Sequence, residues 1–380
     1  MTARGARENP RRTREAAAGA GPGTPVALKR AMSLPPTLGV IANPVSARDI
    51  RRVVAHAGNL QITDRVNIVL RLLQAARAAG VQRALLMPDR GGIRALLERH
   101  LKRGDPSPPA IEFLGMEPES TVEDTFAATR LLQRAGVAAI AVLGGDGTHR
   151  AVVRELIEGE SAIPIAGLST GTNNAFPEMR EPTITGLALG LYAAGRLADD
   201  EALVANKLIE VRITGPGGTR RDVAIVDAVV THDRSVGARA LWKPQSLAAC
   251  YLAFAEAQAI GLSAIGGLLQ PVGRRDRGGL AVQLAHDAQH ALLDLHVPIA
   301  PGLVRPVPVA AWQRMVAGEP LTVLAEAGTV ALDGERELAF EAGERVTMTL
   351  REDAFRTLDV TRCMAVAARD GLFRSPASPR

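Results

Sequence analysis

The chain has 380 residues, of which 47% are hydrophobic and 22% are charged. This length predicts roughly two or three domains, and the composition excludes a wholly disordered chain, a collagen and a coiled coil. Aromatic residues make up only 3% of the chain, which argues against a protein that stacks the bases of single-stranded nucleic acid.

The formal net charge of +5 is concentrated in residues 1–31, which contain seven basic and two acidic residues. The rest of the chain has 38 residues of each sign, so we expect no nucleic-acid partner. The two cysteines, Cys250 and Cys363, lie far apart and give neither a disulfide framework nor a zinc-binding spacing. We therefore expect a protein of a reducing compartment, the cytoplasm.

Residues 1–34 are rich in Arg, Ala, Gly and Pro and show no apolar period. They are interpreted as a disordered basic extension. A transit peptide is the alternative, because the segment is rich in arginine and poor in acidic residues, although it has no clear amphipathic face. Met32 is an alternative translation start.

Residues 35–200 alternate between short apolar runs and segments with a helical period. The pattern predicts strands at 38–42, 84–87, 111–114, 138–143 and 163–167, and helices at 62–79, 91–101, 120–133 and 149–158. Such alternation is typical of an α/β domain whose parallel sheet has helices on both faces. Ligands of such a domain lie beyond the carboxyl ends of the strands.

Residues 201–350 favour a mostly-β second domain, the expected substrate domain. The segments 208–213, 323–332 and 345–350 alternate, and 222–231 is rich in β-branched residues. The stretch 247–269 is apolar apart from Glu256, and it predicts a buried helical insert near 245–270. A membrane span, which needs about 20 apolar residues, is disfavoured by three late glycines. Residues 351–380 are expected to return to the first domain.

The clearest chemical signal is Gly144-Gly145-Asp146-Gly147-Thr148, between a buried strand and a helix. Glycines let backbone N–H groups approach a phosphate closely, and the helix N-terminus adds a partial positive charge. Asp146 would repel a phosphate, so we interpret it as a general base toward a hydroxyl or as a magnesium ligand, directly or through water. The alternative is a tight turn in which Asp146 caps the helix.

A second polar loop, Gly167–Asn174, follows the next strand. Small hydroxyl and amide side chains with glycine suit contacts to phosphate, ribose or adenine; a plain surface turn is the alternative. The loop also contains the G-x-S-x-G pattern of a hydrolase nucleophile elbow. In that case Ser169 would be the nucleophile, with a histidine chosen from His232, His286, His290 and His296.

Three further positions are candidates on weaker grounds. Asn43-Pro44 closes the first strand and so falls on the ligand edge of the sheet, or is a simple turn. Asp227 is a single carboxylate in an apolar run, and burying it requires a partner. Asp333-Gly334-Glu335 has the composition of a hairpin turn. None of the four lysines precedes Ser or Thr, which excludes a Walker A loop.

These segments together resemble the NAD kinase and diacylglycerol kinase superfamily. Gly144–Thr148 is similar to its GGDGT motif, and Asn43-Pro44 to the N-P that ends its first strand. The run Ala224–Val230 resembles the dinucleotide-contacting stretch of NAD kinases, and Asp333-Gly334-Glu335 resembles their closing hairpin. Within the superfamily, Ile41–Ser46, Ser169–Pro177 and Leu262–Gly267 are most similar to the AcoX-type branch, which is associated with acetoin catabolism.

The resemblance implies an α/β nucleotide domain, a β-sandwich-like second domain and transfer of phosphate from ATP or polyphosphate with Mg²⁺. It implies that Asp146 activates the 2′-hydroxyl of the adenosine ribose of NAD, giving NADP, that Asp227 binds the acceptor, and that the protein is a homo-oligomer without a membrane span. The implied phosphate- and nucleotide-binding residues are Asn43, Gly144, Gly145, Gly147, Thr148, Thr170, Gly171, Thr172, Asn173 and Asn174.

Two positions depart from the NAD kinase pattern. Val226 stands where NAD kinases usually have asparagine, and the 169–174 loop is closer to the G-T-x-N loops of lipid kinases. A kinase for a lipid or another small hydroxyl acceptor is therefore an alternative. A non-catalytic, dinucleotide-binding regulatory protein is the alternative from another class.

Overall fold

The structure is a computed structural model, and it describes residues 35–44, 60–102, 108–170, 174–233, 246–287, 289–334 and 336–374. The extension expected over residues 1–34 falls outside these ranges.

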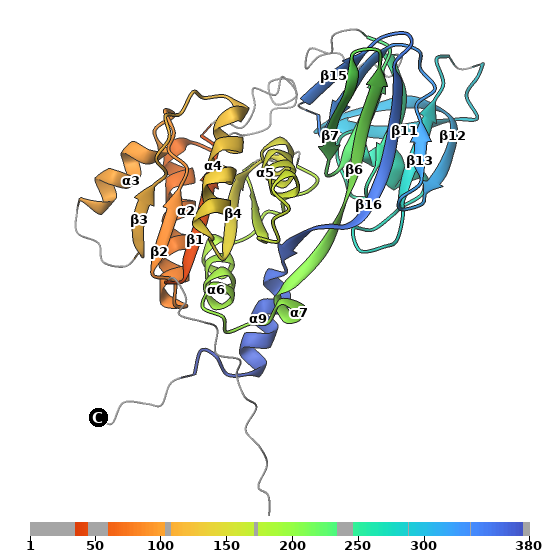
Figure 1. The fold of residues 1–380 in the computed structure, drawn as a ribbon. Helices are drawn as coiled ribbons and strands as arrows, with labels where there is room; N and C mark the ends of the chain where they lie inside the picture. The colour runs from red at the N-terminus through yellow and green to blue at the C-terminus, as the bar shows by residue number, and fades with distance from the viewer. Residues whose placement is uncertain are drawn as a thin grey trace, which may run out of the picture. The chain divides into compact units, whose positions relative to one another are not determined.

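The first part of the chain alternates strands and helices, as the sequence predicts (Figure 1). Its elements are β1 (Thr37–Ala42), α2 (Ile62–Ala78), β2 (Arg83–Leu86), α3 (Ile93–Leu101), β3 (Ala110–Phe113), α4 (Val122–Ala135), β4 (Ala139–Gly144), α5 (Asp146–Glu158), β5 (Ile165–Ser169), α6 (Pro182–Ala193) and α7 (Asp199–Ala202). Helix α5 begins three residues earlier than expected, and helices α6 and α7 were not predicted from the sequence.

Strands β1 to β5 form a parallel sheet in the order β3-β2-β1-β4-β5. Both faces are covered: α4 and α5 pack in one hydrophobic core and α2, α3 and α6 in the other. Strands β1 and β4 are buried along their whole length, which explains their continuous apolar sequence. The carboxyl ends of β1, β2 and β4 therefore meet at one edge, where the candidate site lies.

The second part is mostly antiparallel. Its elements are β6 (Leu203–Gly215), β7 (Gly218–Ala224), β8 (Asp227–Thr231), β9 (Leu247–Leu252), α8 (Ser263–Leu269), β10 (Gly279–Leu284), β11 (Leu293–Ala300), β12 (Leu303–Met315), β13 (Pro320–Thr322), β14 (Gly328–Leu332), β15 (Arg336–Phe340), β16 (Arg345–Leu358) and α9 (Val360–Arg369). One sheet has the order β11-β12-β10-β9-β8-β14-β15. The predicted class, an α/β domain followed by a mostly-β domain, is confirmed.

The long strands β6 and β16 pair with each other, and β16 also joins the parallel sheet. Thr357 pairs with Ile165 of β5, beyond an irregularity in the β6–β16 register between Arg351 and Phe355. One sheet therefore continues from the α/β part into the β-rich part. Domain boundaries near residues 200 and 350 stay a proposal, and both strands cross from one part to the other.

The buried helical insert expected near 245–270 is present only in part. Leu247–Leu252 is strand β9, and only Ser263–Leu269 is helical. Strand β9 lies between β8 and β10 and is buried on both faces, so its sequence is continuously apolar and does not alternate. A short run of this kind does not distinguish a strand from a buried helix.

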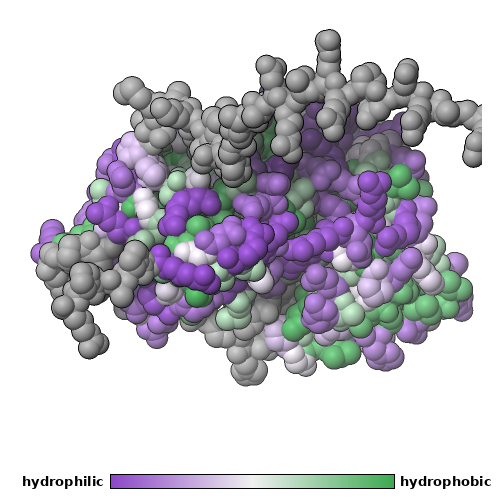
Figure 2. Space-filling model, turned by 90° about the horizontal axis from the view of Figure 1, so that it is seen from below, coloured by the Kyte–Doolittle hydropathy of each residue, from purple (hydrophilic) through white to green (hydrophobic). Residues whose placement is uncertain are grey.

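Among the helices of the described residues, none is both long enough and apolar enough to cross a membrane. Figure 2 shows one face of the molecule, on which hydrophilic residues predominate and hydrophobic ones form small groups. The large apolar side chains are mainly in the cores, including Leu38, Ile41, Ile140 and Ile165, none of which is exposed.

Candidate functional site

The Gly144–Thr148 segment makes the turn from β4 into α5. Gly145 is the N-cap of α5, so Asp146 is its first helical residue and not its cap. A Cβ on Gly144 would lie 2.6 Å from Cβ of Thr148. Glycine at 144 therefore lets the helix start directly against the strand end.

A cavity of about 330 Å³ opens beside this turn. Asn43, Asp89, Gly147, Thr148 and Arg150 are among the residues that line it. The side-chain amide of Asn43 donates to Oγ1 of Thr148 over 3.2 Å, which joins the end of β1 to the first turn of α5. The N–H groups of that first turn have no acceptor within the helix, so this end of α5 is suited to an anion. The structure thus brings Asn43, Gly147 and Thr148 to one cavity.

The carboxylate of Asp146 contacts the loop that follows β5. It accepts hydrogen bonds from the backbone N–H of Ala175 over 2.9 Å and of Phe176 over 2.8 Å, one on each oxygen. These bonds hold the segment Ala175-Phe176 against the start of α5. Asp146 consequently has a structural role besides any chemical role, and the sequence alone did not show it.

The hairpin carboxylate Asp333 lies beside Asp227. Asp333 accepts from the backbone N–H of Ile225, Val226 and Asp227 over 3.0, 2.8 and 3.1 Å. Burial raises its pKa well above the ordinary value, and the negative charges of Asp227 and, more weakly, Asp146 act in the same direction. Asp227 and Asp146 therefore both lie within electrostatic range of Asp333, although the three carboxylates are far apart in the sequence.

A buried ion pair supports the same region. Arg150 on α5 donates to Asp222 on β7 over 3.1 Å, and the two side chains are only 3% and 2% exposed. This pair joins the α/β part to the β-rich part next to the carboxylates. Sequence reasoning missed it, because neither residue belongs to a recognisable motif.

The second polar loop is described only at its ends. Thr170 is buried, and the side-chain amide of Asn174 donates to Oγ of Ser169 over 2.8 Å. Gly171, Thr172 and Asn173 lie outside the described residues. Helix α6 does not begin until Pro182, so Ser169 does not occupy the strand–turn–helix elbow that the hydrolase alternative requires.

His149, next to the motif, is fully buried, and its Nδ1 lies 2.8 Å from the carbonyl oxygen of Gly145. Burial lowers its pKa from 6.5 to about 4, although hydrogen bonds with the backbone of Gly145 and Val142 oppose the shift. The ring is therefore neutral at pH 7. It packs near the ring of Phe176, with 5.8 Å between the centroids.

The described residues contain no cluster of three His, Cys, Asp or Glu side chains placed to hold a metal ion. Mg²⁺ commonly binds through one or two carboxylates together with substrate phosphates and water. A magnesium ion bound in that way needs no cluster of three protein ligands.

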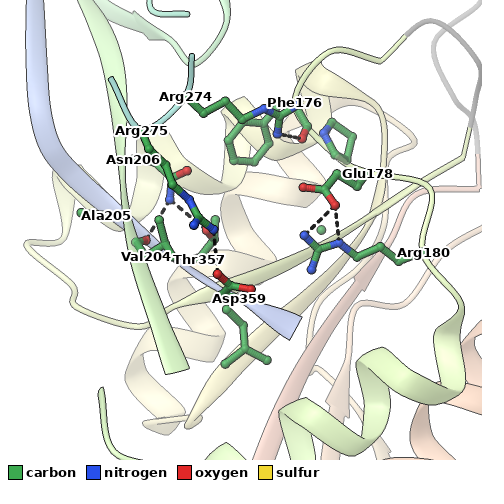
Figure 3. A pocket seen from close by; sticks show the side chains of 13 residues that line it. Phe176, Glu178, Arg180, Val204, Ala205, Asn206, Arg274, Arg275, Thr357 and Asp359 are labelled. Atoms are coloured by element: carbon green, nitrogen blue, oxygen red, sulfur yellow. Dashed lines mark hydrogen bonds and ion pairs between the residues drawn. The ribbon is translucent and has the colours of Figure 1, made fainter. Parts of the chain in front are cut away.

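A second, smaller cavity of about 110 Å³ lies between the loop after β5, strands β6 and β16, and the loop after α8. Figure 3 shows the paired charges of its lining. Arg180 binds Glu178 over 2.7 Å, and Arg275 binds Asp359 over 2.7 Å. This cavity could not be predicted from the sequence, because its residues come from four separate segments.

The fold and the turn at Gly144–Thr148 place the first part of the chain in a known class of domain. Residues 38–196 match the family model of the ATP-NAD kinase N-terminal domain. Residues 207–353 match the acetoin catabolism protein X C-terminal domain.

The acetoin catabolism protein X of Cupriavidus necator is 58% identical over 348 residues, which are 90% of this chain and 96% of that protein. The chain therefore belongs to the acetoin catabolism protein X family, and the resemblance stated from its motifs is confirmed.

Solved structures with a similar fold come from two kinds of kinase. The yeast NADH kinase complexed with NADH is 12% identical, with a TM-score of 0.47 and 91% of both chains covered. A diacylglycerol kinase of Bacillus anthracis strain Sterne is 14% identical, with a TM-score of 0.39 and coverage of 86% of this chain and 97% of that one.

Proposed function

We propose that the protein transfers a phosphoryl group from ATP to a hydroxyl group, with the 2′-hydroxyl of the adenosine ribose of NAD as the acceptor. The observation that carries the proposal is the position of Asp146. It lies at the N-terminus of α5, next to the residues that line the 330 Å³ cavity, and within electrostatic range of Asp333, which lies beside Asp227. The proposal assigns the donor phosphates to the first turn of α5 and the acceptor to the side of Asp227.

In this proposal the phosphates of ATP bind at the first turn of α5. The N–H groups of Gly147 and Thr148 and the helix dipole stabilise their negative charge. Asp146 accepts the proton of the acceptor hydroxyl. At the same time the oxygen of that hydroxyl attacks the γ-phosphorus of ATP, and ADP leaves. Mg²⁺ supplies charge neutralisation on the phosphates when it is bound. In the same proposal Asp227, which is only 9% exposed, orients the acceptor.

The test is NADP formation with ATP and Mg²⁺, with the wild type beside Asp146→Asn. The amide keeps the size of the side chain but accepts a proton poorly, so we expect NADP from the wild type and a loss of about 100-fold or more in the variant. Polyphosphate in place of ATP tests the donor. If the wild type forms no NADP, NAD is not the acceptor.

Val226 favours a second candidate, a kinase for a lipid or another small hydroxyl compound. Its side chain is buried and apolar, and its backbone N–H donates to Asp333. A valine cannot supply the side-chain hydrogen bond that NAD kinases usually provide with asparagine at this position. A screen of NAD, NADH, diacylglycerol in detergent and small polyols as acceptors distinguishes the two candidates.

The third candidate is a dinucleotide-binding regulatory protein without catalysis. It is favoured by the two hydrogen bonds that the Asp146 carboxylate accepts from the backbone N–H groups of Ala175 and Phe176. If the Asp146 carboxylate only holds this loop, the protein has no general base at this position. Nucleotide binding, and not turnover, is then the property to measure. Tight binding of NAD without phosphoryl transfer to any acceptor would support this candidate. A cytoplasmic location and a homo-oligomeric state stay predictions.

A further inference from the structure

Arg274 lies in the loop between α8 and β10, in the β-rich part, and reaches the segment that holds Asp146. Its Nη1 donates to the carbonyl oxygen of Phe176 over 2.6 Å, and its Nη2 donates to the carbonyl oxygen of Ala175. Figure 3 shows the guanidinium beside the ring of Phe176. One side chain thus binds two consecutive carbonyl groups of the other part of the chain.

The peptide group between Ala175 and Phe176 is bound on both sides. Its oxygen accepts from Arg274, and its N–H donates to Oδ1 of Asp146. A cation on the carbonyl polarises the peptide, so its N–H becomes a stronger donor to the carboxylate. The guanidinium, the peptide and Asp146 therefore form one continuous chain of hydrogen bonds.

Arg274 is itself held from several directions. Its guanidinium carbon lies 4.7 Å from the ring centroid of Phe254 and 5.8 Å from that of Phe176, and its Nε lies 3.4 Å from Oε1 of Glu256. Only a planar fork of donors can stack on rings and bind two carbonyls in this way. A lysine at this position would keep the charge but lose the paired geometry.

The 273–278 loop that carries Arg274 is fixed by Lys207 of β6. The ammonium of Lys207 donates to the carbonyl oxygens of Gly273, Asp276 and Gly278 over 3.0, 2.7 and 2.8 Å. The position of Arg274 is thus set by the β-rich part of the chain and not by flexible surface residues.

We propose that Arg274 is a positioning residue for the phosphoryl transfer, because it fixes the Ala175–Phe176 peptide and thereby the carboxylate of Asp146. The proposal rests on the proposed function, in which Asp146 accepts the hydroxyl proton. Misplacement of a reacting group by about 1 Å costs up to about 100-fold in rate. The cavity beside Asn43 and Thr148 does not include Arg274, so nucleotide binding should be insensitive to its removal.

The experiment compares Arg274→Ala, Arg274→Lys and a matched control, Arg275→Ala. Arg275 is the next residue and forms an ion pair with Asp359, whereas the carbonyl groups of Ala175 and Phe176 are bound by Arg274. For Arg274→Ala we expect kcat to fall by about 10- to 100-fold with the KM for ATP changed by less than about threefold. Arg274→Lys should recover part of kcat, and Arg275→Ala should stay within about twofold of the wild type.

Hydrogen exchange at the amides of Ala175 and Phe176 gives a readout that needs no activity. We expect exchange at least about tenfold faster in Arg274→Ala and unchanged in Arg275→Ala, since the anchored peptide is released only in the first. Unchanged exchange in Arg274→Ala, or a rise in KM with constant kcat, would overturn the proposal. A wild type that transfers no phosphate refutes the proposed function instead, and an unchanged exchange rate then still refutes the anchoring.

Discussion

Burial of His149 should make the protein lose stability on mild acidification. The pKa of the imidazole falls from 6.5 to about 4 on folding, chiefly because the ring is removed from water. Below pH 6.5 the unfolded chain therefore binds a proton that the folded chain does not, and stability decreases as the pH falls toward 4. These values predict a loss of about 2 kcal/mol in the free energy of unfolding between pH 7 and pH 5 from this residue alone.

The assay is urea unfolding of the wild type, His149→Gln and the control His296→Gln at pH 7 and pH 5. Glutamine does not titrate and can donate a hydrogen bond to Gly145, so the variant should lose about 2 kcal/mol less than the wild type over this interval. His296 is exposed on β11, so its replacement controls for the loss of a histidine that is not buried. An equal loss in the wild type and His149→Gln would refute the reasoning.

Three other predictions follow from the contacts of the site. Replacing either Arg150 or Asp222, which form a buried pair at 3.1 Å, should cost about 3–5 kcal/mol of unfolding free energy, whereas the double variant Arg150→Met/Asp222→Leu should recover most of it. Gly144→Ala adds a methyl group 2.6 Å from its nearest neighbour, so calorimetry should show nucleotide binding at least about tenfold weaker. Lys207→Met removes the three hydrogen bonds that Lys207 donates to the 273–278 loop. Hydrogen exchange at the amides of this loop should then be at least about tenfold faster.

Features that depend on neighbouring residues were predictable from the sequence. The turn from β4 into α5 is one, because a buried apolar strand, three glycines and a helical period follow one another without interruption. The hairpin at Asp333 is another, and the antiparallel pairing of β14 with β15 confirms it. Only the start of α5 was placed too late, because glycines at 144, 145 and 147 obscure the helical pattern.

Features that depend on distant residues were not predictable. Nothing near Arg274 indicates that it binds Ala175 and Phe176, since a loop arginine in a chain rich in arginine carries no local signal. Strand β9 falls in the segment predicted as a helical insert, because both of its faces are buried and it has no polar alternation. The hydrogen bonds from the backbone N–H groups of residues 225–227 to Asp333 likewise could not be predicted. The sequence singled out both segments, but not that they contact each other.

The pairing of Thr357 with Ile165 has a consequence for synthesis of the protein. Strand β5 leaves the ribosome long before β16. Until β16 is made, the edge of β5 that faces it has no strand to pair with. Helix α9, whose Cys363 and Val366 lie in the same hydrophobic core as α2 and α6, follows β16 in the chain and is made later still. A nascent or truncated chain that ends before β16 is therefore exposed to aggregation and proteolysis, and the α/β part becomes stable only after β16 and α9 have been made.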